Sequence, residues 1–343
     1  MKWVKSLFTA AVATVALGVS NVAQAAELNL FAWSEYVPQS VLDGFQKETG
    51  IKVNYEAYSS NEDMLAKLLS GAAKYDLVQP SEYVIEALIK AGKLQALDHA
   101  KIPNLKNLVP TYTQFAFDVG NKYSVPWMSG HVGIVYNKKK ITDPITGFKD
   151  VFNGKYNKRL VILDDGREIV SWALATQGKD INVITPEALA GVRPMIAGWL
   201  KQVKIYDSDS PKDKLTNGDV DIGVVWSGEG AILLAQDADT WAWVLPVEGT
   251  HRFVDSLAIP VGAPNVEAAH KFIDYMLRPE VSVLISEEFP YTNPNAEARK
   301  LLPEAAQKNI ASFPPDDAKL ELYKDIGDAA KLIDELYTNV KSE

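Results

Sequence analysis

The chain has 343 residues, of which 47% are hydrophobic and 23% charged, which is typical of globular proteins and long enough for two domains. Its formal net charge of −9 argues against nucleic acid and anionic membrane surfaces as partners, because both would repel it. With no cysteine in the chain, neither disulfides nor thiolate chemistry contribute.

The N-terminus has the pattern of a bacterial secretory signal peptide. Two lysines precede an apolar stretch over residues 7–19, and Ala23-Gln24-Ala25 supplies a small-x-small cleavage site. The apolar stretch is short for a membrane span, and no later segment approaches ~18 continuous apolar residues. No cysteine follows the cleavage site, which argues against a lipoprotein anchor. We therefore expect residues 1–25 to be removed and a soluble protein to be exported to the periplasm.

Strands and helices are expected to alternate along the first part of the mature chain. Strand patterns occur at residues 27–33, 51–58 and 75–81, and helical spacing of apolar residues occurs at 39–49 and 59–70. Gly50 and Gly71 follow the two helices, where a C-cap glycine is common. The order strand, helix, strand, helix, strand predicts a mainly parallel sheet with helices on its faces.

The same alternation returns in the second part of the chain. Strand patterns occur at residues 159–165, 203–209, 220–228, 240–246 and 253–262, with helices at 168–176 and 265–280. No internal repeat, low-complexity tract or long flexible linker separates the two parts. We therefore expect two α/β lobes between which the chain crosses on strands, with 133–137 and the region around 250–255 as candidates.

Aromatic and acidic side chains recur where the predicted strands end, which is where ligands bind in open α/β sheets. The residues at these ends are Trp33, Ser34, Glu35, Tyr36, Ser81, Glu82, Tyr83, Asp164, Asp165, Glu168, Trp226, Ser227 and Glu229, and Phe253 and Asp255 lie near the later crossing. Lysine and arginine are scarce there, with Arg167 and Arg252 as the exceptions. Carboxylates replace the lost hydration of an ammonium group and aromatic faces add cation–π contacts, so the pattern suits an organic cation.

Each of these residues also has a purely structural explanation. Trp33 and Trp226 could pack in a core or between the lobes. Asp164 and Glu168 could cap or favour a helix N-terminus, which is the commoner role for a single carboxylate in that position. Tyr83 could lie on a helix surface. Only the coincidence across several strand ends favours a binding site.

Seven stretches of the sequence carry a family resemblance: FAWSEYVPQSVLDGFQKETGIKVNYEAYSSNEDMLAKL, YDLVQPSEYV, YSVPWMSGHVGIVYN, LDDGREIVSWAL, VDIGVVWSGEGA, FVDSLAIPVGAPN and PYTNPNAEARKLL. Through them the mature chain resembles the periplasmic spermidine/putrescine-binding proteins of ABC importers. The resemblance implies a type II periplasmic-binding fold with two α/β lobes, each a mainly parallel sheet flanked by helices, and a ligand in the interlobe cleft. We expect an N-terminal lobe of residues 26–134 plus about 255–305, and a C-terminal lobe of about 135–254 plus about 306–343.

The resemblance also assigns residues to the ligand site. The family's two binding segments in the N-terminal lobe match Trp33, Ser34, Glu35, Tyr36, Ser81 and Tyr83. The acids that hold one end of the polyamine in the family match Asp165 and Glu168, and its central carboxylate matches Asp255. The aromatic residues that line the family's site match Trp226 and Tyr291. The implied function is capture of a polyamine by lobe closure and its delivery to a membrane permease. This function involves no catalysis, cofactor or metal.

Three positions vary between spermidine- and putrescine-binding members of the family. Phe253 stands where spermidine-preferring relatives tend to have tryptophan, and Tyr323 stands where a spermidine binder has glutamine. Glu229 stands where putrescine-selective relatives have an acid. Asp165 together with Glu168 instead resembles the spermidine type. This hybrid leans slightly toward putrescine, with spermidine as a weaker or comparable ligand.

Other function classes remain as alternatives. An exported enzyme could use Asp164, Asp165 and Glu168 as in glycoside hydrolysis, but positions on one turn do not flank a substrate. The four histidines are scattered and lack the spacing of metal ligands. A binding protein for another small solute, such as ferric ion, a sugar or thiamine, and a sensor that presents polyamine occupancy to a signalling partner are the remaining alternatives.

Overall fold

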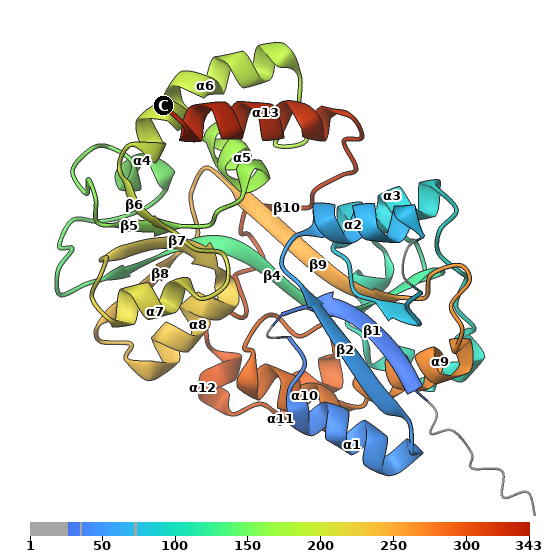
Figure 1. Ribbon diagram of the computed structural model, residues 1–343. Coiled ribbons are helices and arrows are strands. Elements are labelled where there is room, and N and C mark those ends of the chain that lie inside the picture. Colours follow the sequence, from blue (N-terminus) through green and yellow to red (C-terminus); the bar gives the residue numbers. More distant parts are fainter. Residues whose placement is uncertain (1–26, 35, 72–73) are drawn as a thin grey trace, which may run out of the picture.

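The structure is a computed structural model that describes residues 27–343 except 35, 72 and 73 (Figure 1). The predicted signal peptide and the predicted site residue Glu35 therefore lie outside the described residues. None of the helices in the described part of the chain combines the length and the apolar character that crossing a lipid bilayer requires.

The first lobe is built around the parallel strands β1, β2 and β3. Its elements follow the predicted order: β1 (Glu27–Trp33), α1 (Gln39–Thr49), β2 (Lys52–Tyr58), α2 (Asn61–Ser70), β3 (Leu77–Val78) and α3 (Glu82–Lys90). Helix α1 ends at Gly50, whose φ of 72° is the left-handed conformation that glycine adopts without strain. Helix α2 begins at Ser60, whose hydroxyl accepts a hydrogen bond from the Asp63 backbone N–H.

The second lobe is built around the parallel strands β5, β6 and β7. Its elements are α4 (Phe148–Val151), β5 (Leu160–Ile162), α5 (Gly166–Thr176), α6 (Pro186–Leu200), β6 (Val203–Tyr206), α7 (Pro211–Thr216), β7 (Ile222–Trp226), α8 (Ser227–Gln236) and β8 (Trp241–Val244). The C-terminal helix α13 (Ala329–Lys341) packs against α5 and α6 and thereby returns the end of the chain to this lobe (Figure 1).

Further short elements connect and cover the lobes. They are η1 (His99–Lys101), η2 (Pro103–Asn107), η3 (Pro110–Thr113), α9 (Val266–Met276), α10 (Pro279–Glu288), α11 (Ala296–Leu301), α12 (Glu304–Gln307) and β10 (Leu320–Glu321). The single helix predicted over 265–280 is wrong at its end, since α9 stops at Met276 and Pro279 begins α10. Proline has no N–H for the preceding turn and is favoured at the first position of a new helix.

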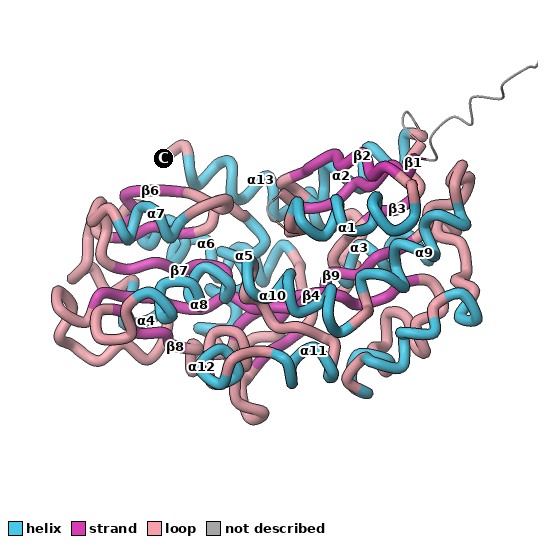
Figure 2. Tube along the Cα trace, turned by 90° about the horizontal axis from the view of Figure 1, so that it is seen from below, coloured by secondary structure: helices cyan, strands magenta, loops and turns pink. Residues whose placement is uncertain are grey.

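Two antiparallel strands, β4 (Ser124–Asn137) and β9 (Thr250–Ala258), join the lobes. The first part of β4 pairs with β9, and its last part pairs with β7 of the second lobe. At its far end β9 pairs with β3 of the first lobe. The described strands thus follow the order β2-β1-β3-β9-β4-β7-β5-β6, with β10 paired to β9 and β8 paired to β4 outside this path, and the lobes lie on either side of β9 and β4 (Figure 2).

Buried apolar side chains gather separately on the two sides of these crossing strands. On one side Phe45 of α1 packs edge-on against Phe272 of α9, with ring centroids 5.0 Å apart. On the other side Phe152 stacks on Trp199, with centroids 4.5 Å apart. The lobe boundaries placed at 134/135 and 254/255 stay a prediction.

Phe45 provides a test of the first core, because its side chain is fully buried. We expect Phe45→Ala to lower the free energy of unfolding by ~3–5 kcal/mol, through lost burial and the cavity left behind. Leu69→Ala is the control, since Leu69 is 46% exposed and its change should stay within about 0.5 kcal/mol. Urea unfolding followed by circular dichroism measures both, and equal effects would contradict the assignment of Phe45 to the core.

Candidate functional site

A cavity of about 660 Å³ lies where strand ends of both lobes meet the crossing strand β9. All the predicted site residues that the structure describes line it: Trp33, Ser34, Tyr36, Ser81, Tyr83, Asp165, Glu168, Trp226, Glu229, Phe253, Asp255, Tyr291 and Tyr323. The structure thus brings the predicted residues together. Their role in holding a ligand stays a prediction.

The topology explains why these side chains meet. Trp33 is the last residue of β1, and Ser81, three residues after the end of β3, is the N-cap of α3. In the second lobe Asp165 is the N-cap of α5, after β5, and Trp226 ends β7. The strands are parallel within each lobe, so their carboxyl ends lie at one edge of each sheet and the two edges face the same space.

Five aromatic rings form a continuous wall of the cavity, here called the aromatic wall: Trp33, Tyr36, Tyr291, Phe253 and Trp226. Neighbouring ring centroids along this order are 6.5, 5.5, 5.8 and 5.6 Å apart. The wall runs from β1 of the first lobe across β9 to β7 of the second. Both tryptophans remain half-buried, so each packs against its lobe and also presents a face to the cavity.

Asp255 on β9 is a buried carboxylate with no basic partner among the described residues. Its Oδ1 accepts a hydrogen bond of 2.6 Å from the Ser81 hydroxyl. Burial raises its pKa to about 7, although hydrogen bonds from Ser81 and Tyr36 and the positive charge of His251 act in the opposite direction. The charged form of Asp255 therefore lacks a counter-charge that a cationic ligand would supply.

Asp165 combines a structural role with a place in the cavity. Its Oδ1 accepts hydrogen bonds of 2.9 and 3.1 Å from the backbone N–H groups of Arg167 and Glu168, so it caps α5. Loss of hydration, followed by repulsion from Glu168 and Glu62, raises its pKa to about 7. The cap expected at Asp164 is wrong, because that side chain turns away to accept a hydrogen bond from the Tyr337 hydroxyl.

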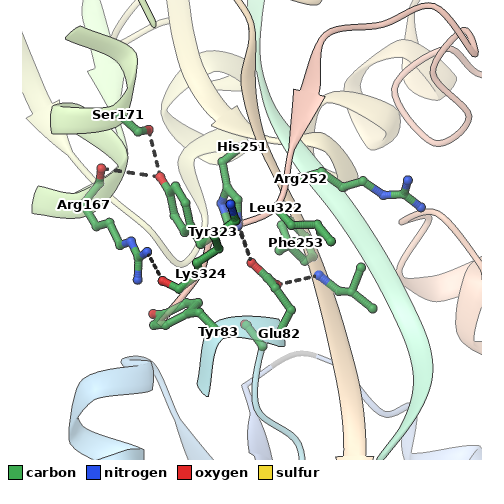
Figure 3. Close-up of polar contacts among 12 residues, drawn as sticks. Glu82, Tyr83, Arg167, Ser171, His251, Arg252, Phe253, Leu322, Tyr323 and Lys324 are labelled. Carbon is green, nitrogen blue, oxygen red and sulfur yellow. Dashed lines mark hydrogen bonds and ion pairs between the residues drawn. The ribbon is translucent and has the colours of Figure 1, made fainter. Parts of the chain in front are cut away.

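His251 bridges two buried carboxylates from different lobes, and Figure 3 shows its contact with one of them, Glu82. Its Nδ1 lies 2.6 Å from Glu168 Oε1 on α5, and its Nε2 lies 3.0 Å from Glu82 Oε1 on α3. Burial alone would lower the pKa of His251, but Glu168 and then Glu82 outweigh that effect and raise the pKa to about 9. His251 is therefore an imidazolium cation at neutral pH.

The partners of His251 are themselves held in place. Glu82 also accepts hydrogen bonds from the backbone N–H groups of Val254, at 2.9 Å, and Tyr323, at 3.1 Å. The second oxygen of Glu168 accepts a hydrogen bond of 3.2 Å from the indole N–H of Trp172. These bonds tie α3, β9, α5 and the segment after β10 into one connected group.

Tyr323 and Arg167 complete this group (Figure 3). The Tyr323 ring stacks on His251 with centroids 3.5 Å apart, and its hydroxyl donates to Ser171 Oγ at 2.8 Å. The Arg167 guanidinium lies 4.1 Å from the centroid of the Tyr323 ring and 4.3 Å from that of the Tyr83 ring. Arg167 and His251 thus add positive charge to a cavity whose charged lining residues are mainly acidic.

Glu229 is neutralised within its own lobe. Lys212 at the start of α7 places its Nζ 3.0 Å from Glu229 Oε1, and its backbone N–H donates to Oε2 at 3.2 Å. Both side chains line the cavity, and Glu229 is buried. The acid that the sequence pattern associates with putrescine therefore already has a cationic partner.

The sequence analysis did not identify Glu82 as the ion-pair partner of His251, and it did not predict His251 or Lys212 as residues of the cavity. His251 had a signal, because residues two apart on a strand face the same side and Phe253 and Asp255 were already candidates. No such sequence signal pointed to Lys212, because only the packing of α7 against α8 brings it to Glu229.

The arrangement suits an organic cation. Asp255 and Asp165 lack basic partners among the described residues, and the aromatic wall supplies faces for ammonium groups and apolar surface for methylenes. Within the same residues, no group of three or more His, Cys, Asp or Glu side chains is placed to hold a metal ion.

Comparison with known proteins places the chain among solute-binding proteins. Residues 40–314 match the family described as bacterial extracellular solute-binding protein. The spermidine/putrescine-binding periplasmic protein of Salmonella typhimurium is 37% identical over 99% of both chains. The putrescine-binding periplasmic protein SpuD of Pseudomonas aeruginosa is 33% identical over 90% of both.

A solved structure confirms the predicted fold class. The spermidine/putrescine ABC transporter substrate-binding protein PotD from Streptococcus pneumoniae superposes with a TM-score of 0.79 and 30% sequence identity. The match covers 92% of this chain and 99% of that one.

The raised pKa of Asp255 predicts how stability depends on pH. The pKa of Asp255 is about 3.8 in the unfolded chain and about 7 in the folded protein. Because the folded state holds the proton more tightly, Asp255 stabilises the folded state fully at low pH, and this stabilisation is lost as pH rises from about 4 through about 7. Asp255→Asn stays neutral, so we expect the ligand-free variant to gain on the order of 4 kcal/mol over the parent protein at pH 8 and little at pH 4. Thermal or urea unfolding at both pH values measures this.

The control is Asp239→Asn, because Asp239 is exposed and its neutralisation should change stability little at either pH. A gain from Asp255→Asn that is equal at pH 4 and pH 8 would contradict the assignment of a raised pKa to Asp255.

Proposed function

The chain belongs to the bacterial extracellular solute-binding protein family and, within it, to the spermidine/putrescine-binding group, and from this premise we propose that it captures a polyamine for an ABC importer. The two curated relatives named above are periplasmic binding proteins for polyamines, and the solved structure is that of an ABC transporter substrate-binding protein. The proposal includes export to the periplasm through the N-terminal signal sequence and delivery of the ligand, chemically unchanged, to a membrane permease.

The observation that carries the proposal is the pair of carboxylates without basic partners, Asp255 and Asp165, in a cavity with an aromatic wall. Ionising Asp255 without a counter-charge costs free energy, as its raised pKa shows. An ammonium group beside it removes that cost by a charge-assisted hydrogen bond. The ring faces of Trp33 and Trp226 can contact the methylene chain between two such groups.

Lobe closure explains how binding is signalled to a permease. Trp33 and Ser81 line the cavity from the first lobe, Asp165 and Trp226 line it from the second, and β9 crosses between them. A ligand that contacts both lobes interacts fully only when they are closed, so it shifts the population toward the closed form. The permease would then recognise the closed form and receive the ligand when the lobes separate.

Titration calorimetry on ligand-free protein tests the proposal. We expect saturable binding of putrescine or spermidine, and we expect Asp255→Asn to weaken it more than tenfold, because an ammonium in the cavity loses its paired charge at a cost of ~2–5 kcal/mol.

Asp239→Asn serves as the matched control, because it makes the same chemical change at an exposed position and should leave the affinity unchanged. Tighter binding of a sugar or a neutral amino acid than of any polyamine would refute the proposed function.

A further inference from the structure

Among the described residues, four carboxylates face the cavity from buried or half-buried positions: Asp255, Asp165, Glu168 and Glu229. Two of them have cationic partners, since His251 pairs with Glu168 and Lys212 pairs with Glu229. No described basic residue forms an ion pair with Asp255 or Asp165. The other acids that the described lining contains are exposed, where water and salt weaken their attraction for a cation: Glu62, Asp164, Asp209, Glu288 and Asp334.

Glu168 is occupied on both oxygens. Its Oε1 lies 2.6 Å from His251 Nδ1, and its Oε2 accepts the Trp172 indole N–H at 3.2 Å. The side chains of both Glu168 and His251 are almost fully buried. A ligand ammonium that reached Glu168 would have to share it with an imidazolium cation, which would repel the ammonium at short range.

His251 cannot easily swing aside to make room. Its ring lies flat on Tyr323, at an interplanar angle of 11°, and its Nε2 is held by Glu82 at 3.0 Å (Figure 3). Glu82 is fully buried and fixed by the backbone N–H groups of Val254 and Tyr323. The cation is therefore part of the folded structure, built into the wall of the cavity.

We propose that His251 determines ligand selectivity by occupying Glu168, which leaves two of the described buried or half-buried cavity carboxylates, Asp255 and Asp165, without an ion-pair partner and available to the two ammonium groups of a diamine. This inference rests on the proposed polyamine function, and it adds which polyamine length the site prefers. The third ammonium of a triamine would lose its hydration without gaining another buried, unpaired carboxylate from the part of the chain that the structure describes, and its charge would lie near the imidazolium. Putrescine-type diamines should therefore bind more tightly than spermidine-type triamines.

The test replaces the built-in cation and measures the ratio of two affinities. In His251→Asn an uncharged amide can still donate a hydrogen bond to Glu168, and adding Glu82→Gln removes the carboxylate that would otherwise lose its counter-charge. We expect this double variant to raise the affinity for spermidine relative to putrescine about tenfold or more, because Glu168 becomes free to pair with the third ammonium.

A reversal and a control separate this effect from general damage. Adding Glu168→Gln to the double variant should return the affinity ratio to that of the parent protein, since the freed carboxylate is gone. His99→Asn is the control, because His99 is exposed and lies outside the cavity lining. Calorimetry with both ligands gives the ratios, and retained putrescine binding shows that each variant is folded.

The outcomes distinguish this proposal from the proposed function. If the parent protein binds no polyamine, the function itself is wrong. If the parent protein binds polyamines but prefers spermidine, or if the folded double variant keeps the parent ratio, the function stands and the role of His251 is overturned. If the double variant does not fold, the preference of the parent protein between putrescine and spermidine still tests the role of His251.

Discussion

A carboxylate buried without a counter-charge is the constraint around which this protein is arranged. Asp255 lies on β9, the strand that crosses between the lobes, and its side chain is 1% exposed. The Ser81 hydroxyl compensates part of the lost hydration, but no described cation completes the pairing. The ligand-free protein therefore carries an electrostatic cost that a bound ammonium group would remove, and the position on a crossing strand links that gain to both lobes.

One face of a single strand carries the chemistry of the cavity. His251, Phe253 and Asp255 alternate along β9, so a cation, a ring and an anion follow one another at the same side of the sheet. Glu82 of the first lobe holds this strand through His251 and the Val254 backbone, and Glu168 of the second lobe holds it through His251. The proposed binding residues Phe253 and Asp255 therefore lie on the same strand as the contacts that connect the lobes.

Local patterns predicted the elements well where periodicity and capping agreed. Helix α1 has the predicted bounds 39–49, and its glycine stop has the expected conformation. The continuous helix over 265–280 failed because apolar periodicity runs on through Pro279, whereas the missing N–H divides it into α9 and α10. Asp165, and not Asp164, caps α5, a distinction of one residue that periodicity does not resolve.

The sequence by itself determined the alternation of strands and helices, and with it the placement of aromatic and acidic side chains at one edge, because parallel strands align their carboxyl ends. Only the tertiary structure decided which acids keep their charge uncompensated. His251 meets Glu168 across 83 positions of the chain, and Lys212 meets Glu229 across 17. Such pairings depend on how β9 packs against α5, and how α7 packs against α8, and neither contact leaves a local pattern in the sequence.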